Sequence, residues 1–305
     1  MRQPQWIADL CVTENLPPSY AETACRYLEP LAAKAGELRK TKSRPVVIGI
    51  SGAQGSGKST LALFLENHLR CEAQLSTTCL SLDDFYFGKA ARRDLADKVH
   101  PLFATRGVPG THDVQLALNV LRGLTEVQVP ATIRVPKFDK ATDDCLPENV
   151  WPEVDTPVDV VILEGWCLGA RPQDAASLTH PVNVLEDEDD PDGSWRRRVN
   201  DHLSGDYREL FDQLDTLIML RIPSFDKILE WRGVQEEKLV QKSAAAGYEE
   251  LNLDRFIMHF ERLTRHMLQT MPSYVDTIID IDDQHRMSNM THYLRRQSNS
   301  SDAKF

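Results

Sequence analysis

Residues 46–60 read VVIGISGAQGSGKST, in which a short β-branched run passes directly into a glycine-rich segment and then into an amphipathic stretch. The segment fits the pattern G-x-x-x-x-G-K-[ST], which forms a phosphate-binding loop between a strand and a helix. Its glycines let the backbone turn so that N–H groups and the positive end of the following helix face phosphate oxygens. The residues expected to bind the nucleotide are Gly52, Ala53, Gln54, Gly55, Ser56, Gly57, Lys58, Ser59 and Thr60.

Two side chains of this loop have predicted roles of their own. Lys58 can reach the β- and γ-phosphates of a nucleoside triphosphate, and the hydroxyl of Ser59 can ligate Mg²⁺. The alternative is a chance glycine-rich turn, which the flanking strand and helix patterns disfavour. The sequence therefore predicts nucleotide binding.

Composition and charge narrow the class of function. The 305 residues are 41% hydrophobic, which suits one large or two small domains with a substantial core. The net charge is −11, from 35 Lys and Arg against 46 Asp and Glu, and it argues against general binding to nucleic acid or to an acidic membrane. Neither a membrane-spanning run nor a signal peptide is evident, and the six scattered cysteines lack metal-binding spacing, so we expect a cytoplasmic protein with reduced thiols.

Five apolar runs are predicted to form strands, and the segments between them have helical patterns. This alternation predicts a parallel α/β sheet. The runs cover residues 46–51, 78–83, 158–163, 216–221 and 277–282. Along the chain we expect an N-terminal helical extension at 1–44, the main domain at 45–285 and a polar, frayed tail at 286–305.

Acidic residues follow two of the predicted strands. Asp83 and Asp84 come at the end of the second run, and Glu164 follows the third. Ligands bind at the carboxyl ends of parallel strands, so Asp83 is a candidate base for an attacking hydroxyl or an outer partner of Mg²⁺. Glu164 is a candidate to hold Mg²⁺ through water or to polarise the nucleophile, and the alternative is an acidic residue that merely leaves the strand. A helix cap or a turn is the alternative role for such an aspartate, and it suits Asp84 better.

The loop at 98–113 is punctuated by proline and glycine and leads into a helix. It carries Arg106 and His112, which could bind an acidic acceptor. The residue types equally allow a solvated connection. Thr111 or Asp113 is expected to cap the helix.

Three further segments carry charges. Residues 137–140 read KFDK and could hold an anion or face water, whereas the acidic run at 185–193 is interpreted as a solvated surface. Arg232 is followed at helical spacing by Gln235 and Glu236. A surface pair of Arg232 with Glu236 would contribute only about 0.3–0.5 kcal/mol. The sharper hypothesis is therefore a mobile helix that presents Arg232 to the transferring phosphoryl group.

Several of these motifs occur together in one order. They are the phosphate loop at 52–60, LDDFY at 82–86, R-G and G-T-H-D within 106–113, KFDK at 137–140, LEGW at 163–166 and W-R-x-x-Q-E at 231–236. Over about residues 44–285 the chain resembles the P-loop kinases of the plant and fungal D-glycerate 3-kinase type and their bacterial relatives. The wider group includes uridine kinase, pantothenate kinase and phosphoribulokinase.

The resemblance implies the P-loop NTPase fold, with a five-stranded parallel sheet, flanking helices, the N-terminal extension and a helical lid. It also implies a kinase that uses ATP and Mg²⁺. The implied catalytic residues are Lys58, Asp83 as the base, Glu164 and, on the lid, Arg232. The implied metal ligands are Ser59, Asp83 and Glu164. The implied acceptor-binding residues are Asp83, Tyr86, Arg106, His112, Asp113, Lys137, Asp139 and Trp166.

The leading hypothesis is transfer of the γ-phosphoryl group of ATP to a hydroxyl of a small acid, with D-glycerate as first choice. The alternatives are a nucleoside or pantothenate kinase, a regulatory ATPase that transfers phosphate only to water, and a noncatalytic nucleotide-binding protein. The N/T-K-x-D segment of guanine-binding GTPases is absent from the sequence, and the full set of candidate catalytic side chains disfavours a noncatalytic role. The expected partner is a small molecule rather than nucleic acid or a membrane, and the oligomeric state stays open.

Overall fold

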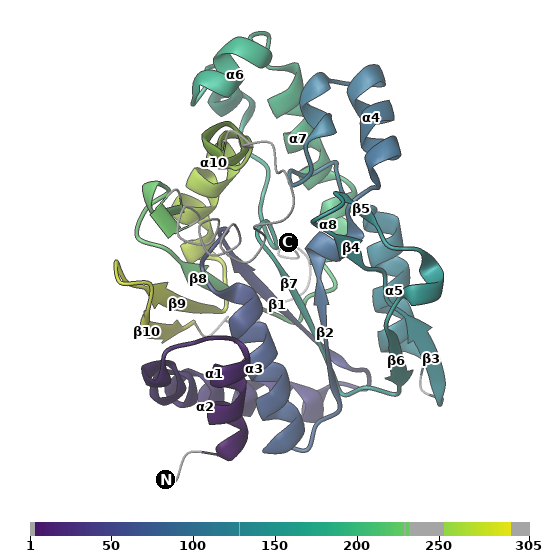
Figure 1. The fold of residues 1–305 in the computed structure, drawn as a ribbon, viewed down its shortest axis with the longest axis vertical. Coiled ribbons are helices and arrows are strands. Elements are labelled where there is room, and N and C mark those ends of the chain that lie inside the picture. The colour runs from purple at the N-terminus through teal and green to yellow at the C-terminus, as the bar shows by residue number, and fades with distance from the viewer. Residues whose placement is uncertain (1–3, 128, 229, 232–252, 294–305) are drawn as a thin grey trace.

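The computed structural model describes residues 4–127, 129–228, 230–231 and 253–293 of the chain (Figure 1). Within these residues a central sheet of six strands has the order β10-β9-β8-β1-β7-β2. Its strands are β1 (Val46–Gly52), β2 (Thr77–Ser81), β7 (Val160–Gly165), β8 (Thr216–Arg221), β9 (Thr277–Ile281) and β10 (Met287–His292). All neighbouring strands are parallel except β9 and β10. In the described part of the chain, the predicted α/β fold with five parallel strands is confirmed.

The strand register brings the carboxyl ends of the three strands β1, β7 and β2 to one edge of the sheet. Gly165 at the end of β7 lies beside Ser51 of β1, and Ser81 at the end of β2 lies beside Glu164. Every residue of β1 and β7 is buried, and their successive side chains enter two opposite hydrophobic cores. Burial on both faces explains the nearly continuous apolar runs in the sequence. The phosphate loop and the acidic residues therefore start from the same edge of the sheet.

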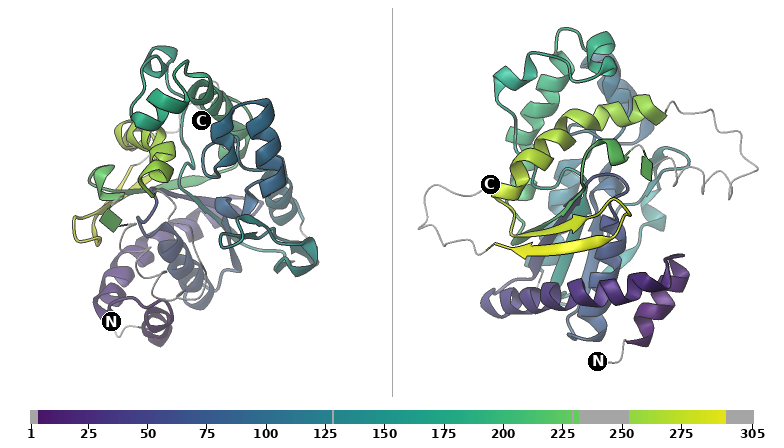
Figure 2. Two further views of the ribbon diagram at one scale, coloured as in Figure 1. Left: turned by 45° about the horizontal axis from the view of Figure 1, so that its top comes forward. Right: turned by 90° about the vertical axis from the view of Figure 1, so that its left-hand side faces the viewer.

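Helices cover both faces of the sheet (Figure 2). One face is covered by α1 (Gln5–Thr13), α2 (Pro18–Thr41) and α3 (Lys58–Cys71), and the other mainly by α5 (Val114–Glu126), α8 (Asp206–Phe211) and α10 (Leu253–Thr270). The helix predicted in the N-terminal extension is α2. Its residues Tyr27 and Leu28 are buried in the core that α3 also enters. The extension thus shares a hydrophobic core with the rest of the fold.

The remaining elements lie outside the central sheet. In the described residues, two short antiparallel pairs are formed by β3 (Ala131–Arg134) with β6 (Glu153–Thr156) and by β4 (Phe138–Asp139) with β5 (Asp144–Cys145). Beyond the carboxyl ends of the strands stand α4 (Lys89–Lys98), α6 (Val184–Asp189) and α7 (Ser194–Ser204) (Figure 1). The 3₁₀ turns are η1 (Leu82–Phe85), η2 (Pro101–Ala104), η3 (Glu148–Val150), η4 (Ala175–Leu178) and η5 (Met271–Ser273). Among the helices of the described ranges, none is both long and apolar enough to cross a membrane.

Part of the predicted tail at 286–305 is a strand. β10 pairs antiparallel with β9 and forms one edge of the sheet. Asp282 organises the turn between the two strands by accepting the backbone N–H groups of Gln284 and Arg286, at 3.0 and 2.9 Å. The prediction of a frayed tail is therefore wrong for residues 287–292. An antiparallel edge strand can face water, so it does not need the apolar run by which the other strands were recognised.

Candidate active site

The phosphate loop joins β1 to α3 as the sequence predicts. Gly55 and Gly57 have φ angles of 78° and 88°, a region that glycine adopts without steric cost. Gly57 caps α3, and the unpaired N–H groups of the first turn of a helix attract anions. The polar atoms Gln54 Oε1 and Ser56 Oγ are buried and have no hydrogen-bond partner among the described residues. The loop therefore has the backbone geometry of a phosphate site, and the unpaired hydroxyl of Ser56 is a donor available to a phosphate oxygen.

Glu164 lies near the end of β7 and contacts the helix that follows the phosphate loop. Its Oε1 atom accepts hydrogen bonds from Ser59 Oγ at 3.0 Å and from Ser81 Oγ at 2.7 Å. Its Oε2 atom is buried and has no partner in the described part of the chain. Of the three residues predicted to bind Mg²⁺, Ser59 and Glu164 are thus in contact, whereas Asp83 has other partners.

The donor set around Glu164 fits Mg²⁺. This ion prefers oxygen ligands and usually keeps waters or substrate phosphate oxygens in its coordination sphere. The unpaired Oε2 of Glu164 and the hydroxyl of Ser59 are such ligands. Across the described ranges, no cluster of three or more His, Cys, Asp or Glu side chains could hold a metal by itself. Mg²⁺ would therefore be shared between these two residues and the phosphates of the nucleotide.

Ser81 is a residue of this site that the sequence did not indicate. It occupies the last position of β2 and donates to Glu164. Its side chain reaches that carboxylate because β2 pairs with β7 in a register that sets Ser81 opposite Glu164. The order of strands in the sheet carries this information, and the local residue pattern does not.

Asp83 lies in η1, immediately after β2. Its Oδ1 atom accepts a hydrogen bond from Tyr86 OH at 3.0 Å, and its Oδ2 atom pairs with Lys140 Nζ at 2.7 Å. Burial alone would raise the pKa of Asp83, but the positive charges of Lys140 and Lys58 outweigh this effect and hold the pKa below its ordinary value. Asp83 is therefore ionised at neutral pH. Lys58 of the phosphate loop thus acts on the charge of Asp83, and both residues follow strands that end at the same edge of the sheet.

Tyr86 and His112 form a buried stack behind Asp83. Their ring centroids are 4.4 Å apart, and His112 Nδ1 lies 2.5 Å from the hydroxyl of Tyr207, which accepts the backbone N–H of Gly110 at 3.1 Å. Burial lowers the pKa of His112 to about 4 and raises the pKa of Tyr86 well above its ordinary value. At neutral pH, His112 is therefore uncharged, and Tyr86 keeps the proton that it donates to Asp83. In this structure the two predicted acceptor ligands support Asp83 from behind, and Tyr207 was not indicated by any motif.

Arg106 is held by an acidic residue in the turn between β4 and β5. Its guanidinium group pairs with the carboxylate of Asp143 and lies 5.6 Å from the centroid of the Phe138 ring. The buried Arg92 pairs with the same carboxylate at 2.8 Å. The predicted acceptor cation Arg106 therefore faces this hairpin, and its side chain stays about one-fifth exposed, at 22%.

The charged residues of the KFDK segment at 137–140 lie in the hairpin of β4 and β5, which sets the partner of each charge. Lys137 Nζ pairs with Asp84 at 2.7 Å, so it fastens the hairpin to η1. Asp139 accepts the hydroxyl of Thr142 at 2.8 Å and closes the turn. Lys140 is the lysine that reaches Asp83. The sequence-based choice of Lys137 and Asp139 as acceptor ligands thus falls on residues with structural partners, and Asp84 contacts a lysine instead of capping a helix.

The loop before α5 is packed rather than solvated. Asp113 caps α5 by accepting a backbone N–H of its first turn at 2.9 Å, a role predicted for either Asp113 or Thr111. The indole N–H of Trp166 donates to the carbonyl of Gly107 at 2.8 Å. Gly107 has a φ of 136°, and a Cβ there would lie 2.3 Å from the Phe260 ring. Trp166 and Asp113, both predicted to contact the acceptor, therefore hold the loop in shape.

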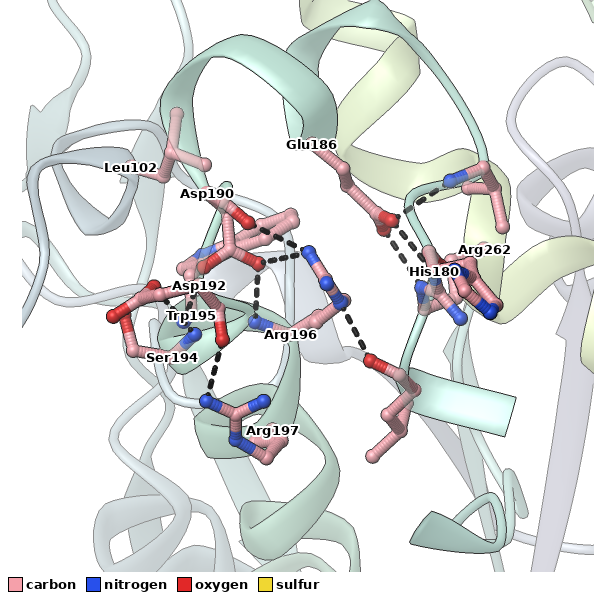
Figure 3. Close-up of polar contacts among 12 residues, drawn as sticks. Leu102, His180, Glu186, Asp190, Asp192, Ser194, Trp195, Arg196, Arg197 and Arg262 are labelled. Atoms are coloured by element: carbon pink, nitrogen blue, oxygen red, sulfur yellow. Dashed lines mark hydrogen bonds and ion pairs between the residues drawn. The ribbon is translucent and has the colours of Figure 1, made fainter. Parts of the chain in front are cut away.

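The acidic segment at 185–193 differs from the solvated surface that we expected. Glu186 and Asp190 are fully buried, and the residues between them are exposed. Figure 3 shows Glu186 paired with Arg262 of α10, at 2.7 and 2.6 Å, and Asp190 paired with Arg196 of α7, at 3.0 Å. The prediction is wrong at these two positions because Glu186 meets Arg262 of α10, 76 residues away, and Asp190 lies in the turn into α7, where it meets Arg196 six residues later.

The proposed lid begins where the described residues stop. Outside them lie the predicted lid residues Arg232, Gln235 and Glu236. Trp231, the residue before them, is buried, and its Cβ lies 3.5 Å from the position of a Cβ built on Gly55. The Trp231 ring stacks on His285 with centroids 4.4 Å apart. The chain therefore enters the predicted lid beside the phosphate loop.

Comparisons with known proteins agree with this geometry. A family model described as the phosphoribulokinase / uridine kinase family matches residues 47–174. The uncharacterized kinase mug58 of Schizosaccharomyces pombe is 32% identical over 245 residues, which are 77% of this chain and 82% of that protein. The chloroplastic D-glycerate 3-kinase of Arabidopsis thaliana is 28% identical over 255 residues, which are 79% of this chain and 53% of that protein. The chain therefore spans about half the length of the Arabidopsis protein.

A solved structure supports the fold independently. The D-glycerate 3-kinase of Cryptococcus neoformans var. grubii superposes with a TM-score of 0.71, covers 87% of this chain and 99% of its own, and is 22% identical. Because the identity is low, this likeness supports the architecture alone. With the phosphate loop, the Ser59–Glu164 contact and the 32% identity to a kinase over most of both chains, the protein belongs to the phosphoribulokinase/uridine kinase family of P-loop kinases.

Proposed function

We propose that the protein transfers the γ-phosphoryl group of ATP to a hydroxyl of a small hydroxy acid, and that D-glycerate is this acceptor. The observation that carries the proposal is an ionised carboxylate, Asp83, set at the same sheet edge as Lys58 and paired with the exposed Lys140. A related protein at 28% identity is named D-glycerate 3-kinase, which supports the choice of acceptor.

At the phosphate end, the amides of the phosphate loop and Lys58 would bind and orient the β- and γ-phosphates. Ser59 and Glu164 would hold Mg²⁺, which when bound offsets the negative charge of the phosphate oxygens. Asp83 would accept a hydrogen bond from the acceptor hydroxyl and direct its oxygen toward the γ-phosphorus. Arg232 would complete the site from the lid, a role that rests on the sequence pattern.

The low pKa of Asp83 defines what this carboxylate contributes. A carboxylate held below its ordinary pKa is a weak proton acceptor. Phosphoryl transfer passes through a loose transition state in which the attacking hydroxyl needs little deprotonation at first. Asp83 would therefore act mainly by orientation and would take the hydroxyl proton late, as the new P–O bond forms.

The acceptor is tested by ADP formation from ATP and Mg²⁺ in parallel reactions with D-glycerate, L-glycerate, uridine, pantothenate and no acceptor. We expect stimulation by D-glycerate alone. The Asp83→Asn variant should lose about 10²- to 10⁴-fold in kcat while its KM for ATP changes little. Asp94→Asn, at an exposed residue of α4 that pairs with Lys98, is the matched control and should keep full activity.

Each other result would point to a different function. Stimulation by uridine or pantothenate would show that the acceptor is that compound and not glycerate, within the same family of kinases. ADP formation that no acceptor changes would favour a regulatory ATPase. An Asp83→Asn variant with a kcat within a few-fold of the parent would remove Asp83 as the orienting base. The proposal includes a cytoplasmic location, which fractionation of cells that express the protein would test.

A further inference from the structure

We propose that Lys140 binds the carboxylate of the acceptor and thereby selects acidic acceptors over uncharged ones. The inference rests on the function proposed above and adds a specificity residue to it. Lys140 lies in the turn of the β4–β5 hairpin, 57 residues after Asp83 in the sequence, and its Nζ atom is 2.7 Å from Asp83 Oδ2. It is thus the described lysine in direct contact with the residue that would orient the reacting hydroxyl.

The other cations of the hairpin and of the loop before α5 pair with carboxylates other than Asp83. Lys137 pairs with Asp84, whose second carboxylate oxygen accepts the backbone N–H of Phe138 at 3.3 Å. Arg106 pairs with Asp143, which also pairs with Arg92. These contacts fix where the hairpin lies on η1 and on the loop before α5. They leave Lys140 as the hairpin cation directed at Asp83.

The exposure of Lys140 allows it to accept a second partner. Its side chain is 61% exposed, whereas that of Asp83 is 22% exposed. A lysine ammonium group carries three N–H donors. One donor can stay on Asp83 while another binds an oxygen of the acceptor. Because an exposed ion pair with a long side chain is weak and adaptable, this rearrangement needs no change in the fold.

Electrostatics explains why such a cation is needed. An acidic acceptor must approach the ionised Asp83 and the negatively charged phosphates of ATP in a protein whose net charge is −11. A positive charge beside the reacting hydroxyl would offset this repulsion in the bound complex. Because Lys140 touches Asp83, the acceptor carboxylate should lie only a few bonds from the hydroxyl that is phosphorylated. This geometry describes a short hydroxy acid.

Steady-state kinetics of the full chain would test the proposal. The variants are Lys140→Gln, which removes the charge, and Lys140→Arg, which keeps it. The acceptors are D-glycerate and glycerol, its uncharged analogue, at saturating ATP and Mg²⁺. The control is Lys98→Gln, because Lys98 is also an exposed lysine paired with an aspartate at 2.7 Å but lies on α4, away from Asp83.

We expect Lys140→Gln to raise the KM for D-glycerate by at least about tenfold and to change kcat less. The same variant should lower kcat/KM for glycerol much less than kcat/KM for D-glycerate, so the preference for the acid should shrink. Lys140→Arg should recover part of the loss, and Lys98→Gln should behave like the parent. If Lys140→Gln instead lowered kcat/KM equally for both acceptors, or changed neither, the proposal would be overturned, because Lys140 would then only position Asp83 or do nothing.

Failure of the proposed function would give a different pattern. If the parent protein phosphorylated another acidic acceptor, glycerate would be wrong and the same comparison would be made with that acid and its amide. If the parent used only an uncharged acceptor, both proposals would fail. If it used no acceptor, calorimetric binding of D-glycerate in the presence of ADP and Mg²⁺ would decide the role of Lys140. Binding that Lys140→Gln weakens at least about tenfold would support it, and absent or unaltered binding would overturn it.

Discussion

The carboxylate of Asp83 owes its properties to residues far from it in the sequence. Tyr86 donates to one of its oxygens and Lys140 pairs with the other. Behind Tyr86, the imidazole of His112 is uncharged because burial lowers its pKa. The stack of these rings keeps Tyr86 oriented toward Asp83. A neutral His112 is therefore part of the support of the site and has a measurable effect on stability.

His112 should make the protein less stable as the pH falls below neutrality. Its pKa is about 4 in the folded protein and has an ordinary value of 6.5, so the unfolded chain takes up a proton first. Stability is fully present above pH 6.5 and is lost progressively down to pH 4, by about 3 kcal/mol in all. Urea unfolding at pH 7 and pH 5 would measure it. Between these two pH values the parent should lose about 2 kcal/mol more than His112→Gln.

Other groups provide the control for this measurement. Burial also lowers the pKa of His68 and of His259, and their effect on the pH dependence should be the same in both proteins. The difference between the two curves therefore isolates His112. Parallel losses of stability in the parent and in His112→Gln would show that His112 is not held neutral by the fold.

The helices α6, α7 and α10 are joined by buried ion pairs above the sheet edge. Glu186 of α6 binds Arg262 of α10 through both carboxylate oxygens and also accepts the backbone N–H of Val182 at 3.0 Å. α10 in turn carries Phe260, whose ring lies against Gly107 in the loop that contains Arg106. An acidic segment that looks like a surface in the sequence therefore anchors a helix that supports the candidate acceptor side of the site.

Glu186→Gln should destabilise the protein strongly. The change leaves the buried guanidinium of Arg262 without its ionic partner, and breaking a buried pair in this way costs about 3–5 kcal/mol. The matched control is Glu188→Gln, two residues later, because Glu188 is exposed and pairs with Arg255 at the surface. That control should cost no more than about 1 kcal/mol. Urea unfolding at pH 7 measures both, and equal small losses would mean that the Glu186 pair adds little to stability.

The molecule as a whole is organised around one edge of its parallel sheet. β1 supplies the phosphate loop, β7 supplies Glu164 and β2 leads into Asp83. Helices on both faces bury these strands, and α4, α6 and α7, which are inserted after β2 and β7, stand beyond their carboxyl ends. The nucleotide would bind where these strands end, so ligand binding should stabilise the whole fold rather than one segment.

ADP with Mg²⁺ should raise the unfolding temperature. A ligand at about 100 times its Kd stabilises the folded state by about 2.7 kcal/mol. Lys58→Ala should remove most of the shift, and Glu164→Gln or added EDTA should remove only the part that depends on Mg²⁺. Lys98→Ala, on an exposed helix outside the site, should keep the full shift. A shift in the parent that EDTA leaves unchanged would exclude a role of Ser59 and Glu164 in holding Mg²⁺ for the nucleotide.

The strands of the central sheet illustrate how far local patterns can be interpreted. β1, β7 and β8 are buried on both faces, so their residues form apolar runs, and the predicted runs at 46–51, 158–163 and 216–221 end within two residues of the observed strands. β10 is a polar edge strand, and its hydrogen bonds to β9 leave no such pattern. Local sequence therefore predicts the strands that are buried on both faces, and it misses an edge strand that pairs with β9 and packs only Met287 and Met290 against the core.

The chain by itself determined the phosphate loop, the five parallel strands with helices between them, and the acidic residues Asp83 after β2 and Glu164 near the end of β7, because each depends on neighbouring residues and on burial periodicity. Only the tertiary structure decided which charges meet. Lys140 rather than Lys137 reaches Asp83, Ser81 joins Ser59 at Glu164, and the acidic segment buries Glu186 and Asp190. The physical reason is that an ion pair or a hydrogen bond needs contact within a few ångströms, and residues far apart in the sequence come that close only when the elements pack.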